Sequence, residues 1–329
     1  MSFNIETKCV QSGYTPKNGE PRVVPIVQST TYKYESSEQM GRLFDLQESG
    51  YFYTRLQNPT NDCVAAKIAD LEGGVGAMLT SSGQAASFFS VFNICSAGDH
   101  VVAASAIYGG TFNLFNVTMR KLGIDFTFVR PDATEEELNA AFKDNTKAVF
   151  AETISNPSLV VLDIEKYARA AHSHGVPLIV DNTFPTPINC RPFEFGADIV
   201  THSTTKYMDG HATSVGGVIV DSGNFDWTQN DKFPGLTTPD ESYHGVVYTE
   251  QFGKAAYITK CNKVHDSAHA RPRFNSVPDE RIPAQSWTRD LASAYAAPLL
   301  KRSRRCKVPE GSSEDRVRPL SRSRGRRIL

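Results

Sequence analysis

The sequence predicts an α/β fold with an open, mostly parallel sheet and helices on both of its faces. Six short apolar runs, each bounded by Gly, Pro or Asp, are typical of strands buried on both faces. They span residues 100–104, 124–129, 148–152, 177–180, 197–200 and 217–220. Helical patterns between the runs are characteristic of parallel sheets whose strands are connected by helices. Ligands of such sheets bind at the loops beyond the carboxyl ends of the strands.

Two of the expected helices have clear boundaries. Thr134 can cap a helix over residues 134–142, and the acidic residues of its first turn favour the positive end of the helix dipole. A second helix is expected over residues 163–174, where Gly175 ends it. Both helices connect predicted strands, as a parallel sheet requires.

The segments before residue 100 are less regular. Residues 1–60 are rich in turn formers and show little periodicity, so we expect an extended arm there and an α/β domain over residues 61–260. The most apolar window, residues 77–95, is interrupted by polar residues at 80–84. We therefore expect a loop leading into a buried helix and no membrane span.

Composition is that of an ordinary globular protein. The 329 residues, 40% hydrophobic and 22% charged, allow one large α/β domain with a smaller companion. The six cysteines are scattered, which fits neither a disulfide framework nor a zinc site and suggests reduced thiols in a cytoplasm. The amino-terminal residues lack an apolar stretch, so we expect no secretory signal and a cytoplasmic location.

Charge is divided unevenly along the chain. Residues 1–260 hold 19 Lys+Arg and 29 Asp+Glu, whereas residues 261–329 hold 16 and 7. A basic segment of this kind can indicate a nucleic-acid or membrane surface.

Three polar motifs follow or precede the predicted strands. The loop Thr80–Ala86 places small residues and Gly83 before a helix, where backbone N–H groups can bind an anion, although such loops are more often plain helix caps. Asp181 directly follows the run 177–180 and is either a turn former or a buried carboxylate that needs a cationic partner.

The third motif is His202–Tyr207, which contains Lys206. A lysine is usually solvated at a protein surface, but this one follows a buried strand, lies among hydroxyl groups and precedes the glycine-rich stretch Gly210–Gly217. Desolvation would lower its pKa and make its amine nucleophilic. An anion-binding loop, an acid and such a lysine together match a pyridoxal-phosphate (PLP) site.

These motifs resemble those of the Cys/Met-metabolism family of fold-type I PLP enzymes, in particular its O-acetylhomoserine sulfhydrylases, over about residues 5–260. The resemblance implies that Lys206 binds the cofactor covalently and moves protons, and that Asp181 pairs with the ring nitrogen. Tyr108 would stack on the ring and act as an acid or base, with Glu152 and Asn156 near the ring hydroxyl. The phosphate would be held by Ser82, Gly83, Gln84, Ser203 and Thr205.

The resemblance also implies an assembly and a reaction. Tyr53 and Arg55, in the stretch Tyr53–Thr60, would reach the phosphate of a neighbouring subunit, so we expect a homodimer or homotetramer. The expected reaction is a γ-replacement in which sulfide converts O-acetylhomoserine to homocysteine and acetate. The stretch Gly210–Gly217 favours a sulfhydrylase over a γ-lyase or γ-synthase, because many relatives have Ser-Asp after the histidine.

Other classes of function have less support. No Gly-x-Gly-x-x-Gly motif opens a helix after a strand, which argues against a nicotinamide-binding dehydrogenase. A nucleic-acid-binding role would depend only on the basic segment after residue 260, and we expect neither a nucleic acid nor a membrane as a partner. A catalytically impaired fragment that still binds the cofactor is the main alternative.

The sequence departs from the family after residue 260. Members of the family continue into a carboxyl-terminal domain, whereas residues 261–329 are arginine-rich and aperiodic. Synonymous codons for residues 265–280, 279–299 and 307–325, read one base later, can spell stretches that resemble that domain. We therefore expect that a frameshift near codon 261 has replaced the small domain with an aberrant, disordered basic tail.

Overall fold

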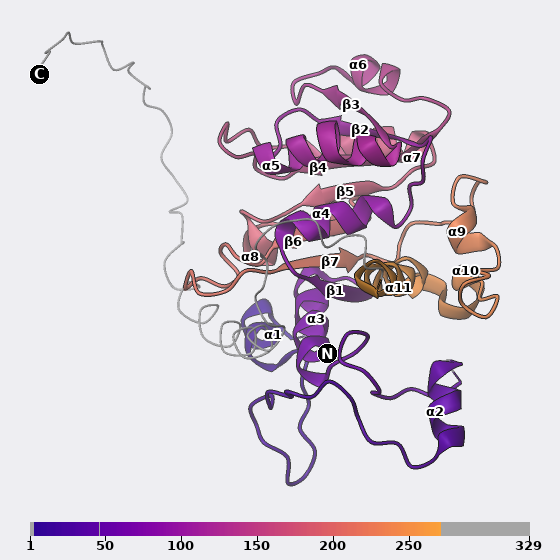
Figure 1. The fold of residues 1–329 in the computed structure, drawn as a ribbon. Coiled ribbons are helices and arrows are strands. Elements are labelled where there is room, and N and C mark those ends of the chain that lie inside the picture. The colour runs from indigo at the N-terminus through magenta and orange to yellow at the C-terminus, as the bar shows by residue number, and fades with distance from the viewer. Residues whose placement is uncertain (1–2, 46, 271–329) are drawn as a thin grey trace, which may run out of the picture.

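The computed structural model describes residues 3–45 and 47–270, and in that part of the chain seven strands form one sheet. The order across the sheet is β1-β7-β6-β5-β4-β2-β3 (Figure 1). Strands β2 to β6 pair in parallel, whereas β7 is antiparallel to both β1 and β6. The strands are β1 Gly76–Thr80, β2 His100–Ala104, β3 Asp125–Val129, β4 Thr146–Glu152, β5 Leu178–Asp181, β6 Ile199–Ser203 and β7 Gly217–Asp221.

Helices connect and cover these strands. They are α1 Ile5–Gln11, α2 Ser37–Phe44, α3 Pro59–Glu72, α4 Gly83–Phe92, α5 Gly109–Asn113, α6 Glu135–Ala140, α7 Ile164–Ser173, α8 Thr186–Asn189, α9 Pro234–Thr237, α10 Tyr248–Phe252 and α11 Ala256–Ala270. A π-helical turn, Leu114–Thr118, and the 3₁₀ turns Met119–Leu122, Pro192–Phe195 and Gly253–Ala255 complete the helical segments.

Side chains of β7 show that helices cover both faces of the sheet. Successive residues of a strand point to opposite faces. Val218 and Val220 pack with residues of α3, whereas Ile219 belongs to the cluster that contains residues of α4 and α11. In Figure 1, α4 crosses the near face of the sheet and α3 lies at its β1 edge.

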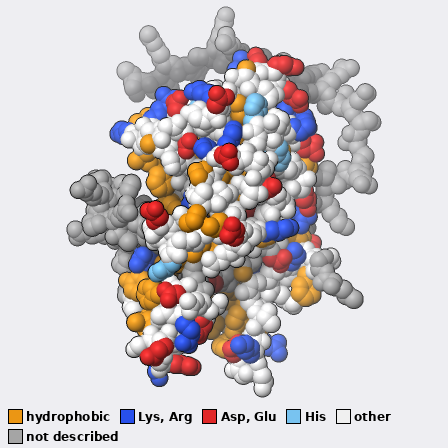
Figure 2. Space-filling view, turned by 90° about the vertical axis from the view of Figure 1, so that its right-hand side faces the viewer, with side chains coloured by type: hydrophobic (Ala, Val, Ile, Leu, Met, Phe, Trp, Pro, Cys, Tyr) orange, Lys and Arg blue, Asp and Glu red, His pale blue; other side chains and the backbone are white. Residues whose placement is uncertain are grey.

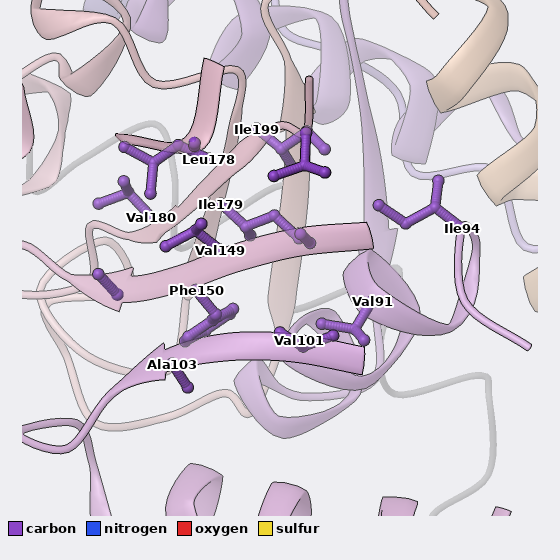
Figure 3. Close-up of a cluster of buried hydrophobic side chains, with 14 of the residues drawn as sticks. Val91, Ile94, Val101, Ala103, Val149, Phe150, Leu178, Ile179, Val180 and Ile199 are labelled. Carbon is purple, nitrogen blue, oxygen red and sulfur yellow. The ribbon is translucent and has the colours of Figure 1, made fainter. Parts of the chain in front are cut away.

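The centre of the sheet is fully buried. Val101, Phe150, Ile179 and Ile199, from four neighbouring strands, have no exposed surface, and all four belong to the cluster drawn in Figure 3. Burial of each such side chain contributes about 1.5–3 kcal/mol to the stability of the fold. The parallel pairing of β2 to β6, with helices on both faces, confirms the prediction of an α/β fold with a mostly parallel sheet.

Both helices with predicted boundaries are confirmed. Thr134 caps α6 through a capping box with Glu137, because Thr134 Oγ1 accepts from the Glu137 N–H at 3.2 Å and the Glu137 carboxylate accepts from the Thr134 N–H at 2.9 Å. Asp163 caps α7 by accepting from the Lys166 N–H at 3.0 Å. Gly175, with a positive φ of 65°, follows that helix.

Three predictions about elements need correction. Residues 77–80, interpreted as part of a loop, belong to strand β1, because they pair with the distant β7. The strand predicted at 197–200 is Ile199–Ser203 and so extends into the polar motif. The segment 1–60, predicted to be an extended arm, contains α1 and α2 and the start of α3.

The last described element is α11, which runs through the predicted change at residue 261. Cys261 is fully buried and Val264 packs against the core. The expectation of an aberrant tail concerns residues 261–329, of which 271–329 lie outside the described residues. Among the described helices, none is long and apolar enough to cross a bilayer. The face shown in Figure 2 mixes acidic, basic and apolar side chains.

Candidate active site

Polar residues gather where three parallel strands end. Glu152, Asp181 and Ser203 are the last residues of β4, β5 and β6, three neighbours in the sheet. They line a cavity of about 440 Å³. Every predicted site residue except Tyr53 and Arg55 lines the same cavity, namely Ser82, Gly83, Gln84, Tyr108, Glu152, Asn156, Asp181, Ser203, Thr205 and Lys206.

Glu152 is a buried carboxyl group in the wall of this cavity, with 6% of its surface exposed. Burial raises its pKa to about 8, and the charge of Asp181 adds to the shift. Hydrogen bonds from the N–H groups of Tyr108, at 2.7 Å, and Asn156 oppose it. Burial thus favours the protonated form of Glu152, and its hydrogen bond to the Tyr108 N–H holds the loop that carries Tyr108.

Asp181 lies beside Glu152 and has one oxygen available. Its Oδ1 accepts hydrogen bonds from the N–H and the hydroxyl group of Thr183, the N–H at 3.0 Å. The other carboxyl oxygen of Asp181, Oδ2, has no hydrogen-bond partner among the described residues. Burial raises the pKa of Asp181, although Thr183 and His202 oppose the shift. A cation in the cavity would stabilise the ionised form.

The amino terminus of α4 forms another part of the cavity wall. Ser82 caps this helix, because its hydroxyl group accepts from the Ala85 N–H at 3.1 Å. The N–H groups of Gly83 and Gln84 have no hydrogen-bond partner within the described part of the chain. The loop is thus a helix cap and also presents N–H groups that suit an anion.

Two glycines let this loop approach the end of β6. A Cβ atom on Gly83 would lie 2.4 Å from Ser203 Cβ, and one on Gly217 would lie 2.2 Å from the Ser82 carbonyl oxygen. Larger side chains at either position would separate the helix terminus from Ser203. Thr205 is held nearby, since its hydroxyl group accepts from the Gly216 N–H at 3.0 Å.

Gln84 connects the anion-binding loop to the loop of Tyr108. Its amide nitrogen donates to the carbonyl oxygen of Gly110 at 2.8 Å, so its side chain holds the protein rather than a ligand. The ring of Tyr108 lies against Gly110, where a Cβ atom would be 2.5 Å from Tyr108 Cε1. Tyr108 lines the cavity and is half-exposed.

Lys206 lines the cavity as predicted, but the expected desolvation is wrong for the chain as described. Lys206 is exposed, as is its neighbour Tyr207. The hydroxyl-rich turn after β6 carries the lysine to the open side of the cavity. Any burial of its amine must come from a bound group or from another segment that covers this side.

Tyr53 and Arg55 are the predicted residues that the fold does not bring to this cavity. Their side chains form a cation–π contact, with the guanidinium carbon 5.2 Å from the ring centroid. Arg55 lines a separate cavity bordered by α3, β1, α10 and α11. Within one chain, therefore, neither residue contributes to the site around Lys206.

Other residues of the site were missed in the sequence. Thr183 accepts from the Ser203 N–H at 2.8 Å while donating to Asp181, so it joins two strand ends. Its position two residues after Asp181 is typical of a side-chain turn and could have indicated this contact. Ser87, Gly110, Thr111, Phe184 and Val215 also line the cavity.

The donors and acceptors of the cavity fit PLP. Two buried carboxyl groups on neighbouring strands suit a cationic ring nitrogen, and the open N–H groups of Gly83 and Gln84 suit a phosphate. A lysine lies at the same cavity. Within the described residues there is no cluster of three or more His, Cys, Asp or Glu that could hold a metal ion.

Solved and curated proteins with similar sequences support this fit. The structure of a putative O-acetylhomoserine (thiol)-lyase from Campylobacter jejuni, which contains an N'-pyridoxyl-lysine-5'-monophosphate, matches with a TM-score of 0.82 and 32% identity. The match covers 91% of this chain and 72% of that one. The fold thus matches that of the fold-type I PLP-dependent enzymes.

The particular family follows from the sequence comparison. The model of the Cys/Met metabolism PLP-dependent enzymes matches residues 6–254, and the chain belongs to this family. It is 48% identical over 263 residues to the homocysteine synthase of Schizosaccharomyces pombe and 46% identical over 254 residues to the O-acetyl-L-homoserine sulfhydrylase of Leptospira meyeri. The matches cover 79% and 77% of this chain, which spans only 61% and 57% of those relatives.

Proposed function

We propose that this chain holds PLP in the cavity at the ends of β4, β5 and β6 and belongs to an O-acetylhomoserine sulfhydrylase. The reaction would convert O-acetylhomoserine and hydrogen sulfide to homocysteine and acetic acid. The observation that carries the proposal is the convergence of Lys206, Asp181 and the α4 terminus on one cavity. The names of the similar proteins from Schizosaccharomyces pombe and Leptospira meyeri support the choice of substrates.

Each part of the cavity would hold one part of the cofactor. Asp181 would accept a hydrogen bond from the ring nitrogen through Oδ2, while Thr183 keeps Oδ1 in place. The N–H groups of Gly83 and Gln84, together with the hydroxyl groups of Ser82, Ser203 and Thr205, would surround the phosphate. Glu152 and Asn156 would lie beside the ring hydroxyl, and Tyr108 would stack on the ring.

Lys206 and Tyr108 would carry the proton transfers. Bound PLP supplies an electron sink for a carbanion at the α-carbon of an amino acid. Lys206 Nζ would remove the α-proton of the substrate and return a proton later, because an amine beside the reacting carbon serves as base and then as acid. The Tyr108 hydroxyl group, on the open side of the cavity, would hold a second proton.

A cofactor-binding chain with impaired turnover is the second candidate. It is favoured by the exposure of Lys206 and by the position of Arg55 away from the cavity. Both features leave the site open to water within one chain. Water then solvates the groups that catalysis requires, which would slow turnover. A γ-lyase or γ-synthase would use the same groups up to the loss of the γ-substituent.

The wider organisation of the protein is also a proposal. We propose a PLP-binding domain over residues 61–260, an arm over residues 1–60 that completes the site of a neighbouring subunit, and an altered segment after residue 260. A homodimer or homotetramer would bring Tyr53 and Arg55 to the partner's phosphate. The free thiols of Cys9, Cys63, Cys95, Cys190 and Cys261 support a cytoplasmic location.

The experiment that tests the proposal combines two measurements on the purified full chain. Titration with PLP should produce the absorbance of a lysine-bound cofactor, and addition of O-acetylhomoserine and sulfide should release homocysteine. Cofactor absorbance without homocysteine would support the second candidate. Failure to bind PLP would contradict both. Sequencing of the gene would test the altered segment, since a one-base shift predicts family-like codons in the alternative frame.

A further inference from the structure

A buried pair of a carboxyl group and an imidazole, Glu72 and His202, lies behind the wall of the cavity. The side chains of Glu72, the last residue of α3, and His202, in β6, are both completely buried. His202 Nε2 and Glu72 Oε1 are 2.5 Å apart. A carboxyl group and an imidazole removed from water in this way require partners, and each is the partner of the other.

The same carboxylate oxygen holds the end of the neighbouring strand. Asn182 Nδ2 donates to Glu72 Oε1 at 3.1 Å and to the Cys190 carbonyl oxygen at 2.8 Å. The side-chain oxygen of Asn182 accepts from the Thr153 hydroxyl group at 3.0 Å. Glu72 Oε1 therefore joins the residue after β5 to a residue of β6.

Glu72 contacts two residues, and each of them is next to a residue of the cavity in the sequence. Asn182 follows Asp181, and His202 precedes Ser203. Glu72 Oε2 and His202 Nδ1 are buried and have no hydrogen-bond partner among the described residues. The connection between these two strand ends through Glu72 therefore depends on Oε1 alone.

We propose that Glu72 is a positioning residue that sets the separation between Asp181 and Ser203. This inference rests on the proposed function in one respect, namely that Asp181 holds the ring nitrogen and Ser203 the phosphate. PLP is rigid, so the distance between these two groups of the protein decides how well both ends can be bound together. Glu72 itself does not line the cavity.

The chain contains a matched control at the other ends of the same strands. Asp198 directly precedes β6, and its Oδ2 accepts from the N–H of Leu178, the first residue of β5, and pairs with His172 Nε2, each at 2.8 Å. Asp198 is also buried. One carboxylate oxygen thus joins β5 and β6 at their amino ends, far from the cavity, as Glu72 joins them at their carboxyl ends.

The first measurement needs no cofactor. Amide hydrogen exchange is compared between the full chain, Glu72→Ala and Asp198→Ala. Loss of Oε1 removes one of the two acceptors of the Asn182 amide and the partner of His202 Nε2, so Glu72→Ala should accelerate exchange at residues 181–183 and 203–205. Asp198→Ala should leave exchange at these residues unchanged and lower the melting temperature only.

The second measurement is the dissociation constant for PLP, determined by absorbance titration. Glu72→Ala should raise it about tenfold, the loss expected when a buried hydrogen-bonded group is removed. Glu72→Gln keeps a carbonyl oxygen that can accept from Asn182 and His202, so it should raise the constant by only about threefold. Asp198→Ala should bind PLP as the unaltered chain does.

The outcomes separate this inference from the proposed function. Unaltered exchange at both strand ends and unaltered PLP affinity in a folded Glu72→Ala would overturn the positioning role. If that variant does not fold, Glu72→Gln compared with Asp198→Asn decides in the same way. If the unaltered chain itself does not bind PLP, the proposed function fails, and exchange at the two strand ends still tests Glu72.

Discussion

Glu152 and Asp181 are opposite each other in the register of the parallel strands β4 and β5, so two carboxyl groups meet at the wall of one cavity. Like charges this close are not both stable in a buried setting, and the pKa values of both groups are raised. A cationic ring nitrogen at Asp181 would remove part of this repulsion. The pair therefore favours a bound cation in the cavity.

The first prediction concerns the pH dependence of stability. Burial raises the pKa of Glu152 from 4.5 to about 8, so its proton stabilises the fold fully below pH 4.5 and is lost as the pH rises through 8. Glu152→Gln should remove this loss, which we expect to be on the order of 4 kcal/mol between pH 5 and pH 9 in cofactor-free protein. Urea denaturation at the two pH values measures it.

Its control is Glu165→Gln, which changes an exposed carboxylate of α7. That variant should follow the pH dependence of the unaltered chain. The same pH dependence in Glu152→Gln as in the unaltered chain would show that the Glu152 carboxyl group is already ionised at low pH.

The second prediction concerns the contact between α4 and β6. Gly83→Ala places a Cβ atom 2.4 Å from Ser203 Cβ and 2.7 Å from Ser203 Cα, so the helix terminus must move. We expect a loss of about 2–3 kcal/mol in the free energy of unfolding, together with weaker binding of PLP. Chemical denaturation and cofactor titration measure the two effects.

Gly41→Ala provides the comparison for a glycine without such a contact. Gly41 lies within α2, and no atom is within 4 Å of an added Cβ atom. The free energy of unfolding of this variant should be about 0.5–1 kcal/mol higher, because alanine favours the helix. Equal effects of the two substitutions would mean that the approach of Gly83 to Ser203 does not matter.

Much of the fold could be predicted because each central strand is a continuous apolar run between turn formers. Strand β1 could not, since its pairing with β7 depends on a residue pattern far along the chain. The cofactor loop, Asp181 and Lys206 could be predicted because each has a chemical role and a recognisable motif. Glu72 could not, because nothing in its surroundings in α3 indicates its contact with His202.

The exposure of Lys206 illustrates a different limit. The sequence places the lysine after a buried strand, which suggested a desolvated amine. Its actual exposure depends on which segments cover the turn after β6, and the described chain supplies none. Side-chain type and strand position are local properties, whereas solvent exposure is a property of the complete assembly.

The third prediction identifies the lysine that binds the cofactor. Borohydride reduction of the chain with PLP fixes an imine to the lysine that forms it. Peptide mass spectrometry should then find the cofactor on Lys206, and Lys206→Ala should show no labelling. Lys254→Ala, which alters an exposed lysine outside the cavity, should label as the unaltered chain does. Equal labelling of several exposed lysines would indicate nonspecific modification.

The fourth prediction tests whether Arg55 acts on a neighbouring subunit. Arg55 lines a cavity other than that of Lys206 in its own chain, yet a guanidinium group suits the phosphate of PLP. Arg55→Ala should raise the dissociation constant for PLP about tenfold. Lys206→Ala lacks the lysine to which PLP is attached by borohydride reduction, but it keeps Arg55. Each variant alone is therefore expected to label poorly at a limiting concentration of PLP.

Mixed assemblies of these two variants would contain a complete site if Arg55 reaches its partner. Lys206 from one subunit would then meet Arg55 from the other, and in a randomly mixed dimer about a quarter of the sites would be complete. Labelling of Lys206 at limiting PLP should rise on mixing Arg55→Ala with Lys206→Ala. It should not rise on mixing Arg55→Ala with the double variant, which lacks both groups. No difference between the two mixtures would place the action of Arg55 within its own chain.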